Sequence, residues 1–402
     1  MKGFKTLDDV DVKGKTVLVR VDINASLDED GVPQPSERIR SAAETIGELS
    51  DKGAKTVVLA HQGRAGDPDF TSLENHAKML SQILEREVRF IDDIFGPAAR
   101  SAISELDNGD ILLLENVRFL AEETLKRDAQ EHSKSFLVQK LSPLIDIFVN
   151  DAFSAAHRSH ASLVGFTPIL PKVLGRTMER ELSSLSRAME NPEKPCVYVL
   201  GGLKPEDAFK VMAHGLETGS MDLALTCGVV GRLVLLAKGV DTGPRDREFF
   251  EKKNFLSFLD QARELVSDFP ERVKAPVDLA AEKDGERVEI DVEDLPTDLE
   301  IFDIGSKTAE EYRKTILSAR TVVMNGPAGV YEREPFAVGT RRILEAIAES
   351  DAFSLMGGGH TITAMEKLGF SADQFSYVSI AGGALISYLG GEKMPAVDAM
   401  RI

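Results

Sequence analysis

The chain has 402 residues, and its 66 acidic and 48 basic side chains give a formal net charge of −18 at pH 7. Domains of about 150 residues are typical, so two or three domains are expected, each large enough to bury its own core. Nucleic acid and anionic membranes both attract positively charged protein surfaces, so the charge argues against either as a general partner. A small anionic ligand remains compatible with it, provided that basic residues gather locally.

The two cysteines and the ends of the chain give no sign of secretion. Cys196 and Cys227 are too few for a disulfide framework, and their spacing does not suggest a zinc site. The N-terminal stretch lacks the apolar region of a secretory signal, and no apolar run approaches the length of a membrane span. We therefore expect a cytoplasmic protein with no nucleic acid or membrane as partner. We also expect the chain to be a monomer.

Short apolar runs alternate with amphipathic segments along the chain, a pattern that favours parallel strands covered by helices on both faces. Right-handed crossovers then predict a doubly wound sheet in each half, an α/β fold. In the first half the predicted strands are Thr16–Val21, Thr56–His61, Ile111–Val117 and Ile145–Asn150, and the predicted helices include Arg38–Leu49 and Leu73–Leu84. In the second half the strands are Cys196–Leu200, Leu223–Thr226, Thr321–Met324, Phe353–Met356 and Tyr377–Ser379, and the helices include Pro205–Leu216 and Phe336–Ala348.

A domain boundary is expected in Phe166–Gly175, where two prolines precede the helical pattern Arg176–Met189. The expected domains are residues 1–170 and 171–389, with 390–402 as a tail that returns to the first domain. The acidic segment Glu282–Asp298 is predicted to be an irregular surface excursion.

Ligands of open α/β sheets bind beyond the carboxyl ends of the strands, so the residues that follow each predicted strand are candidates for a site. One arginine there is usually a solvated surface residue, whereas several in one half of an acidic chain predict a pocket for a phosphate and a carboxylate. Metal ligation by the histidines is an alternative, but their neighbours are basic rather than acidic. The first-half candidates are Arg20, Asp22, Asn24, Arg38, His61, Gly63, Arg64, Glu115, Asn116, Arg118, Asn150, Asp151, His157, Arg158 and His160.

Glycines follow the predicted strands of the second half. Lys204 stands just before a helix start, where a bound anion between it and the helix would make its charge tolerable. The segment Gly357–Thr361 places three glycines between a strand and a helix, so its amides could approach a phosphate. The alternative for Lys204 is an ordinary exposed loop residue, and the alternative for the three glycines is a tight turn with no ligand. With Glu332 as a candidate for ribose hydroxyls, the two halves together indicate phosphoryl transfer between an acid and a nucleotide.

Several segments, in this order, resemble the phosphoglycerate kinase family, particularly its archaeal branch: RVDIN (20–24), SERIR (36–40), HQGR (61–64), LLLENVRF (112–119), VNDAFSAAHRSHAS (149–162), LGGLK (200–204), FDIG (302–305), NGPAGVYE (325–332) and MGGGHT (356–361). The resemblance implies two Rossmann-like domains around a cleft. It also implies a carboxyl-group phosphotransferase of glycolysis and gluconeogenesis, which transfers phosphoryl reversibly between 1,3-bisphosphoglycerate and ADP, giving 3-phosphoglycerate and ATP.

The resemblance also implies which residues bind each substrate, with Mg²⁺ accompanying ATP or ADP. Those for 3-phosphoglycerate are Asp22, Ile23, Asn24, Arg38, His61, Gln62, Gly63, Arg64, Arg118 and Arg158. Those for the nucleotide are Lys204, Glu332, Gly357, Gly358, Gly359, His360 and Thr361. The family's usual aspartate in the glycine loop is His360 here, and imidazole is a poor ligand for Mg²⁺, so the sequence names no direct metal ligand. The family usually has a second lysine four residues after the first, and this chain has Ala208 at that position. Ser379–Ala384 also differs from the glycine-rich motif that the family carries near its C-terminus.

The acceptor carboxylate is ionised at neutral pH, so the reaction needs positioning and charge stabilisation rather than a general base. Arg38 and Lys204 are the candidates for stabilising the moving phosphoryl group. The Phe166–Gly175 turn and the helix after it are the expected hinge of domain closure. A kinase of another small carboxylic or phosphorylated acid, and a non-catalytic metabolite-binding descendant, are the alternative functions.

Overall fold

The computed structural model describes residues 3–402 and divides into two compact units. The first unit contains the chain up to Ser183 together with Lys393–Ile402, and the second is Ser184–Glu392. The division falls inside helix α7 (Arg176–Met189), after the boundary expected at 170/171. The first turn of α7 is held to the first unit because Arg176 donates to Glu48 Oε2 at 2.8 Å and to Asp8 Oδ1 at 2.6 Å.

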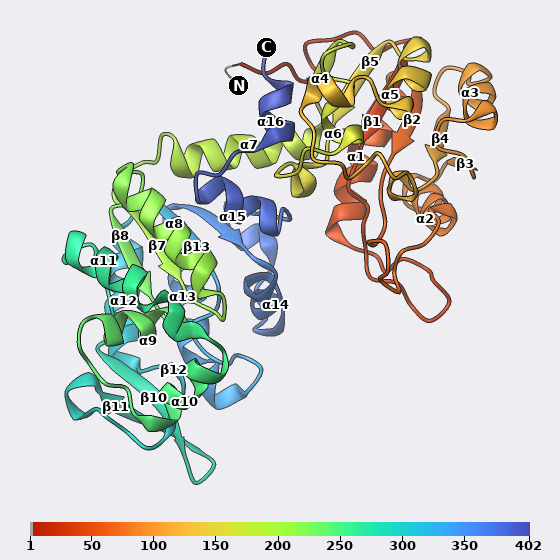
Figure 1. Cartoon of the computed structure of the whole chain (residues 1–402). Coiled ribbons are helices and arrows are strands. Elements are labelled where there is room, and N and C mark those ends of the chain that lie inside the picture. The colour runs from red at the N-terminus through yellow and green to blue at the C-terminus, as the bar shows by residue number, and fades with distance from the viewer. Residues whose placement is uncertain (1–2) are drawn as a thin grey trace. The chain divides into compact units, whose positions relative to one another are not determined.

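The first unit is built on a six-stranded parallel sheet in the order β3–β4–β2–β1–β5–β6, with helices on both faces (Figure 1). Its strands are β1 (Thr16–Arg20), β2 (Lys55–Leu59), β3 (Arg89–Ile91), β4 (Ile111–Leu114), β5 (Ile147–Asn150) and β6 (Lys172–Leu174). Besides the first part of α7, its helices are α1 (Glu37–Asp51), α2 (Glu74–Leu84), α3 (Pro97–Ser104), α4 (Ala129–His132), α5 (Phe136–Leu141), α6 (Ala161–Val164) and α16 (Pro395–Met400).

The four strands predicted in this half are present, because their continuous Val, Leu and Ile runs suit positions buried on both faces of the sheet. Two further strands, β3 and β6, have three residues each, too few for a periodic pattern to reveal them. Strand β6 lies inside the segment that the sequence assigned to a turn.

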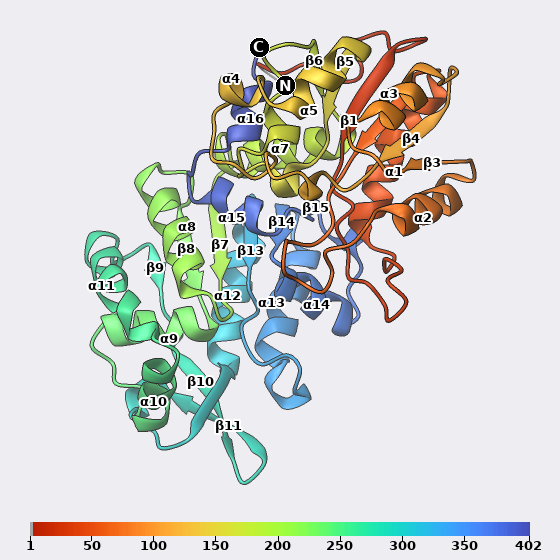
Figure 2. The same cartoon turned by 45° about the vertical axis from the view of Figure 1, so that its right-hand side comes forward.

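The second unit repeats this architecture with a parallel sheet in the order β15–β14–β13–β7–β8–β9 (Figure 2). Its strands are β7 (Cys196–Leu200), β8 (Leu223–Thr226), β9 (Val273–Lys274), β13 (Thr321–Asn325), β14 (Phe353–Gly357) and β15 (Tyr377–Val378). Its helices are α8 (Pro205–Glu217), α9 (Gly228–Ala237), α10 (Pro244–Lys252), α11 (Leu259–Asp268), α12 (Ser306–Ser318), α13 (Val338–Glu349), α14 (Gly359–Lys367) and α15 (Gly383–Leu389). The two parallel sheets with helices on both sides confirm the predicted fold class.

The prediction that Glu282–Asp298 is irregular was wrong over its first half. Strands β10 (Asp278–Lys283) and β11 (Glu286–Asp291) form an antiparallel hairpin, which β12 (Glu300–Ile304) extends to three strands. The hairpin turn is Asp284–Gly285, with φ values of 54° and 85°. Two residues with positive φ make the tight turn that Asp-Gly favours, a signal that the acidic composition obscured.

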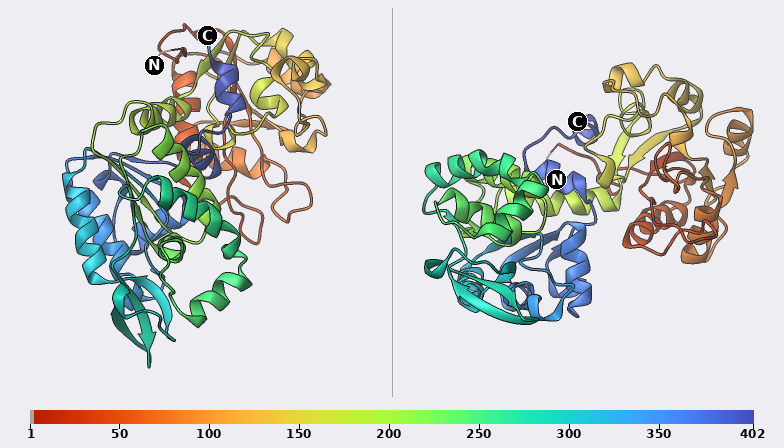
Figure 3. Two further views of the ribbon diagram at one scale, coloured as in Figure 1. Left: turned by 60° about the vertical axis from the view of Figure 1, so that its left-hand side comes forward. Right: turned by 60° about the horizontal axis from the view of Figure 1, so that its bottom comes forward.

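The C-terminal helix α16 packs within the first unit, beside α6 and β6 (Figures 1 and 3). Ala396 N donates to Ala156 O at 3.1 Å, and Lys172 Nζ donates to Ala399 O at 2.6 Å. The first unit therefore takes up both ends of the described chain.

Candidate functional site

The carboxyl ends of β1, β2, β4 and β5 bring the predicted acid-binding residues to one edge of the first sheet. The register aligns Arg20 at the end of β1 with Leu59 of β2 and with Asn150 of β5. The segments that follow these three strands therefore leave the sheet side by side. The segment after β4 adds Arg118, in a short 3₁₀ turn (Val117–Phe119).

The arginines of this edge lie close enough to affect one another's ionisation. Burial, followed by the positive charges of Arg158, Arg20 and Arg64, lowers the pKa of Arg118 to about 10. Burial and the charge of Arg64 also lower the pKa of Arg158. Guanidinium groups stay protonated at neutral pH, so their mutual repulsion marks a basic site that a bound anion would stabilise.

Asp22 is an acidic residue of this edge, and it orients Arg38. Its Oδ2 lies 3.7 Å from Arg38 Nη1 and accepts a hydrogen bond from the Ser154 hydroxyl, while Oδ1 accepts from Asn24 N at 3.0 Å. Burial opposes the ionisation of Asp22, but His61, Arg38 and these hydrogen bonds together outweigh it, so the pKa of the carboxyl lies below its ordinary value. The Arg38 side chain, 33% exposed, is thus aligned at the surface of the site.

The loop after β2 is held by buried contacts. Gln62 is fully buried, and its amide brackets the backbone of Ala25, accepting from Ala25 N at 3.0 Å and donating to Ala25 O at 2.9 Å. Gly63 has φ of 65°, and a Cβ there would lie 2.4 Å from Asp69 O. Ile23 lies in the hydrophobic core. The structure therefore places the side chains of Gln62 and Ile23 in the supporting layer of the loops.

Sequence reasoning missed three polar residues of this edge, Ser154, Ser162 and Glu123. Ser162 is fully buried and accepts a hydrogen bond from Arg20, which is 142 positions away in the chain, and it donates to Glu123. All three lie in or near the motifs of the first half. Spacing alone could not single them out, because their partners come together only through the sheet.

In the second unit, the predicted glycine segments meet at the carboxyl ends of β7, β13 and β14. Gly201 N donates to Asn325 O at 3.0 Å, and Gly202 N donates to Pro327 O at 2.9 Å. A Cβ at Gly326 would lie 2.3 Å from Gly201 O, so this approach requires glycine. Lys204 follows at the N-cap of α8 with its side chain exposed.

The glycine loop after β14 opens helix α14. Gly358 is the N-cap, with φ of 87°, and Gly359 and His360 are exposed in the first turn. The Thr361 hydroxyl is buried and accepts from Gly326 N at 2.8 Å, which ties this loop to the one after β13. Exposed amides at a helix N-terminus suit a phosphate group.

A cavity of about 670 Å³ lies beside these loops within the second unit. Glu332 and His360 line it, together with Leu203 next to Lys204, whereas Gly357–Gly359 and Thr361 are not among its lining residues. The sequence did not predict the wall that α10 and β12 contribute, which includes Phe249 and Phe302. The size and mixed lining suit a nucleotide.

Buried carboxylates stabilise the walls of this cavity. Asp303 accepts from Arg287 Nη1 at 2.9 Å and from Gly339 N at 2.8 Å, and its burial raises the pKa of the carboxyl to about 6. Asp246 pairs with Arg232 and accepts from Thr242 Oγ1 at 2.7 Å. These contacts connect β11, α9 and α10 around the cavity.

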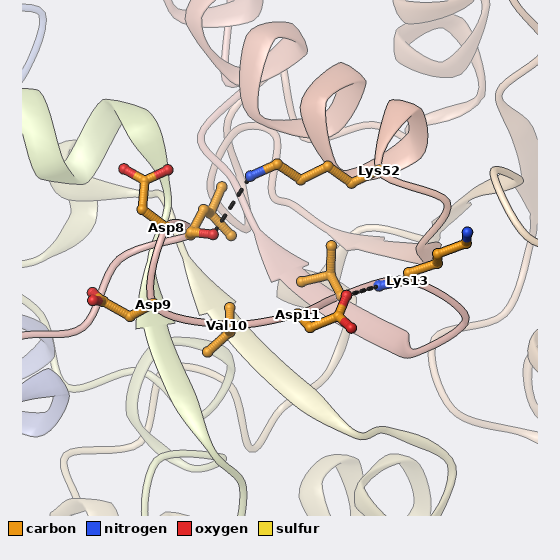
Figure 4. A pocket seen from close by; sticks show the side chains of 8 residues that line it. Asp8, Asp9, Val10, Asp11, Lys13 and Lys52 are labelled. Atoms are coloured by element: carbon orange, nitrogen blue, oxygen red, sulfur yellow. Dashed lines mark hydrogen bonds between the residues drawn. The ribbon is translucent and has the colours of Figure 1, made fainter.

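A separate hollow of about 650 Å³ on the first unit is lined by residues 7–13 and Lys52 (Figure 4). Lys13 N donates to Asp11 Oδ1 at 3.0 Å, and Lys52 Nζ donates to Leu7 O at 3.5 Å. Its three aspartates, Asp8, Asp9 and Asp11, outnumber its two lysines. This charge does not suit an anionic substrate, unlike that of the arginine-rich edge.

Within residues 3–402, no three His, Cys, Asp or Glu side chains come together so as to hold a metal ion. Mg²⁺ usually keeps several waters and binds through one or two carboxylates together with substrate phosphates, so it does not require such a cluster. In the same range, no helix is both long enough and apolar enough to cross a bilayer.

Comparisons with known proteins agree with the fold. A family model described as phosphoglycerate kinase matches residues 7–392. The curated phosphoglycerate kinase of Methanothermobacter thermautotrophicus is 52% identical, covering 99% of this chain and 96% of its own, and that of Methanobacterium bryantii is 49% identical, covering 99% and 97%.

Solved structures show the same similarity in three dimensions. The crystal structure of phosphoglycerate kinase from Pyrococcus horikoshii OT3 has a TM-score of 0.88 at 43% identity and covers 98% of both chains. The Coxiella burnetii phosphoglycerate kinase structure has a TM-score of 0.85 at 31% identity, covering 99% of this chain and 98% of its own. The family model, the curated relatives and the shared fold together show that this chain belongs to the phosphoglycerate kinase family.

Proposed function

We propose that each of the two units of this chain binds one of the two substrates of its reaction. As a member of its family, the chain catalyses the reversible transfer of phosphoryl between 1,3-bisphosphoglycerate and ADP. The first unit binds the acid at its arginine-rich edge, and the second binds the nucleotide at its glycine loops and cavity. The observation that carries the proposal is that Arg64, Arg118 and Arg158 follow neighbouring parallel strands whose carboxyl ends meet at one edge of the first sheet, in a chain whose net charge is −18.

For the acid, Arg64, Arg118 and Arg158 are the proposed ligands of the phosphate and carboxylate, since arginine forks match both groups. His61, Asn24 and the Gly63 backbone complete the site. Ile23 and Gln62, which are buried, support these loops rather than contact the substrate.

For the nucleotide, the phosphates meet the amides of Gly357–Gly359 and the Lys204 ammonium, while His360 and Glu332 flank the base and ribose in the cavity. The Thr361 hydroxyl, bonded to Gly326 N, positions the loop. Mg²⁺ accompanying the nucleotide would be held mainly by the phosphates and water, as is usual for this ion.

The chemical step needs no general base, because the attacking carboxylate of 3-phosphoglycerate is already ionised. Charge accumulates on the equatorial oxygens of the moving phosphoryl group, and cations positioned there lower the barrier. Arg38, oriented by Asp22, and Lys204 fill this role. The two ligands must meet for transfer. The Phe166–Gly175 segment, expected to be the hinge, lies within the first unit and contributes β6 to its sheet, so the proposed hinge is α7, inside which the two units divide.

A coupled assay of ADP formation from ATP tests the function. Activity with 3-phosphoglycerate and none with other small carboxylic acids is expected. Turnover only with another acid would support the alternative kinase, and binding without turnover would support a non-catalytic metabolite-binding protein. We further propose that the chain acts as a monomer in the cytoplasm, which sedimentation and cell fractionation would test.

A further inference from the structure

A buried chain of hydrogen bonds runs through the first unit and ends at His61. We name its four residues, Glu123, Ser162, Arg20 and His61, the buried relay. Arg20 Nε lies 2.8 Å from Ser162 Oγ, which lies 2.7 Å from Glu123 Oε1, and Arg20 Nη2 lies 3.0 Å from His61 Nδ1. None of the four residues is more than 5% exposed.

The direction of every hydrogen bond in the relay follows from the chemistry of arginine, which carries donors only. Ser162 Oγ must therefore accept from Arg20, which leaves its own proton for the Glu123 carboxylate. At the other end of the guanidinium, His61 Nδ1 must likewise accept. Arg20 thus fixes the polarity of the relay in both directions.

The surroundings keep Glu123 and Arg20 in place. Glu123 Oε2 accepts from Ser162 N at 2.8 Å, so both carboxylate oxygens are bonded to one residue. Burial lowers the pKa of Arg20, and the negative charges of Glu123 and Asp22 oppose that effect. His160 Nδ1 lies 3.7 Å from Glu123 Oε1, but burial lowers the pKa of His160 to about 3, so it faces the carboxylate as a neutral ring.

His61 is also neutral. Burial, with the charges of Arg20, Arg118 and Arg158 added to it, lowers its pKa well below the ordinary value, although Asp22 acts in the opposite direction. A neutral imidazole carries one ring proton. Since Nδ1 accepts from Arg20, that proton resides on Nε2.

We propose that Glu123, Ser162 and Arg20 are positioning residues that hold His61 as its Nε2–H tautomer, a hydrogen-bond donor toward the acid substrate. Phosphate and carboxylate oxygens are acceptors, so a ring nitrogen with a bare lone pair would repel them. The relay disfavours the Nδ1–H tautomer, whose Nε2 carries the bare lone pair. It does so without adding another positive charge to an edge already rich in arginine. The tautomer follows from the buried contacts alone, whereas the ligand that it serves rests on the proposed function.

The tautomer can be measured on the unmodified protein by ¹⁵N NMR of the histidine rings at neutral pH, with His61 assigned from a His61→Gln sample. A single protonated nitrogen, Nε2, is expected for His61. A proton on Nδ1, or exchange between the two tautomers, would overturn the proposal. The tautomer itself is measured on the unmodified protein, and the His61→Gln sample serves only to assign the signal.

Ser162→Ala tests the relay itself, because it separates Arg20 from Glu123 and leaves His61 and every arginine in the sequence. A mixture of His61 tautomers and a KM for 3-phosphoglycerate raised about 5- to 10-fold are expected, with kcat and the KM for ATP nearly unchanged. Ser133→Ala is the matched control, since its buried hydroxyl donates to Gln130 O at 2.7 Å and has no contact with the relay.

Two results distinguish the relay from the function that it serves. If Ser162→Ala keeps the parent tautomer and the parent KM, the relay has no positioning role. If the Nε2–H tautomer is present but the His61 signals do not move when 3-phosphoglycerate is titrated, the relay is supported and the assignment of the acid to this edge fails.

Discussion

Arg38 and Arg118 differ in how their guanidinium groups are held. Arg38 is aligned by the Asp22 carboxylate at 3.7 Å, whereas Arg118 donates to the Gly63 carbonyl and lies among other arginines. A residue that meets the moving phosphoryl group stabilises the transition state, whereas one that grips the bound acid contributes equally to substrate and transition state.

We expect Arg38→Ala to lower kcat about 10²- to 10³-fold with little change in the KM for 3-phosphoglycerate. Arg118→Ala is expected mainly to raise that KM, since losing uniform binding leaves kcat unchanged. Steady-state kinetics with both substrates varied would measure this, with Arg40→Ala, an exposed arginine paired with Glu37, as the control. An unchanged kcat in Arg38→Ala would remove its role in the chemical step.

His360 stands in the exposed first turn of α14, and no carboxylate cluster accompanies it. His360→Ala should therefore change the half-saturating Mg²⁺ concentration less than about two-fold, because phosphates and water hold the ion. His360→Asp, which supplies a hard oxygen ligand at the same place, should lower that concentration. A large loss of activity in His360→Ala that excess Mg²⁺ restores would contradict this.

The identities of the site residues were more predictable than their individual roles. Positions after strands are fixed by the local sequence, so Asp22, Asn24 and His61 could be named in advance. Whether a side chain faces a ligand or the protein depends on partners far away in the chain. The burial of Gln62 against Ala25, 37 positions earlier, is such a case, and no local pattern encodes it.

At the scale of elements, helix α7 depends on a buried carboxylate for its first turn. Asp151 Oδ1 accepts from Thr177 N at 2.7 Å and from Met178 N at 3.2 Å. Burial raises the pKa of Asp151 to about 7 although these bonds oppose it. Its contribution to stability is therefore full below about pH 4, where the carboxyl is protonated in the folded and unfolded chain, and declines as pH rises toward 7.

Asp151→Asn should remove this pH dependence because it cannot ionise. Between pH 5 and pH 7.5, the free energy of unfolding of the parent should fall by about 2–3 kcal/mol more than that of the variant. Denaturant unfolding at the two pH values would measure the difference, and Asp92→Asn, which removes an exposed carboxylate, should behave like the parent. Parallel pH profiles for parent and Asp151→Asn would refute the assignment.

Strands were predicted correctly where the run of apolar residues was long. They were missed where the run was short or interrupted by charged residues. The buried five-residue run of β1 was visible, but the three-residue strand β3 was not. In Glu286–Asp291 the charged residues of an outward-facing edge strand hid an alternating pattern. The Asp284–Gly285 turn was the better signal, since its positive φ values commit the chain to a hairpin.

At the scale of the whole molecule, each unit has its own sheet, its own core and its own candidate site. The arginine-rich edge is built entirely from residues before Ser183, and the nucleotide cavity entirely from residues between Ser184 and Glu392. Sites with no shared residues are expected to respond independently to substitution.

Calorimetry on full-length variants tests this independence. Arg118→Ala should weaken binding of 3-phosphoglycerate at least ten-fold and leave the affinity for ADP within two-fold of the parent, because it removes a charged ligand from only one site. Glu332→Ala should show the reverse pattern, since Glu332 lines the cavity of the second unit that we assign to the nucleotide. In the double variant, the loss of binding free energy for each substrate should equal the loss seen in the single variant that affects that substrate. Weaker ADP binding in Arg118→Ala would mean that the nucleotide also depends on the first unit, and the proposed division of the substrates would then fail.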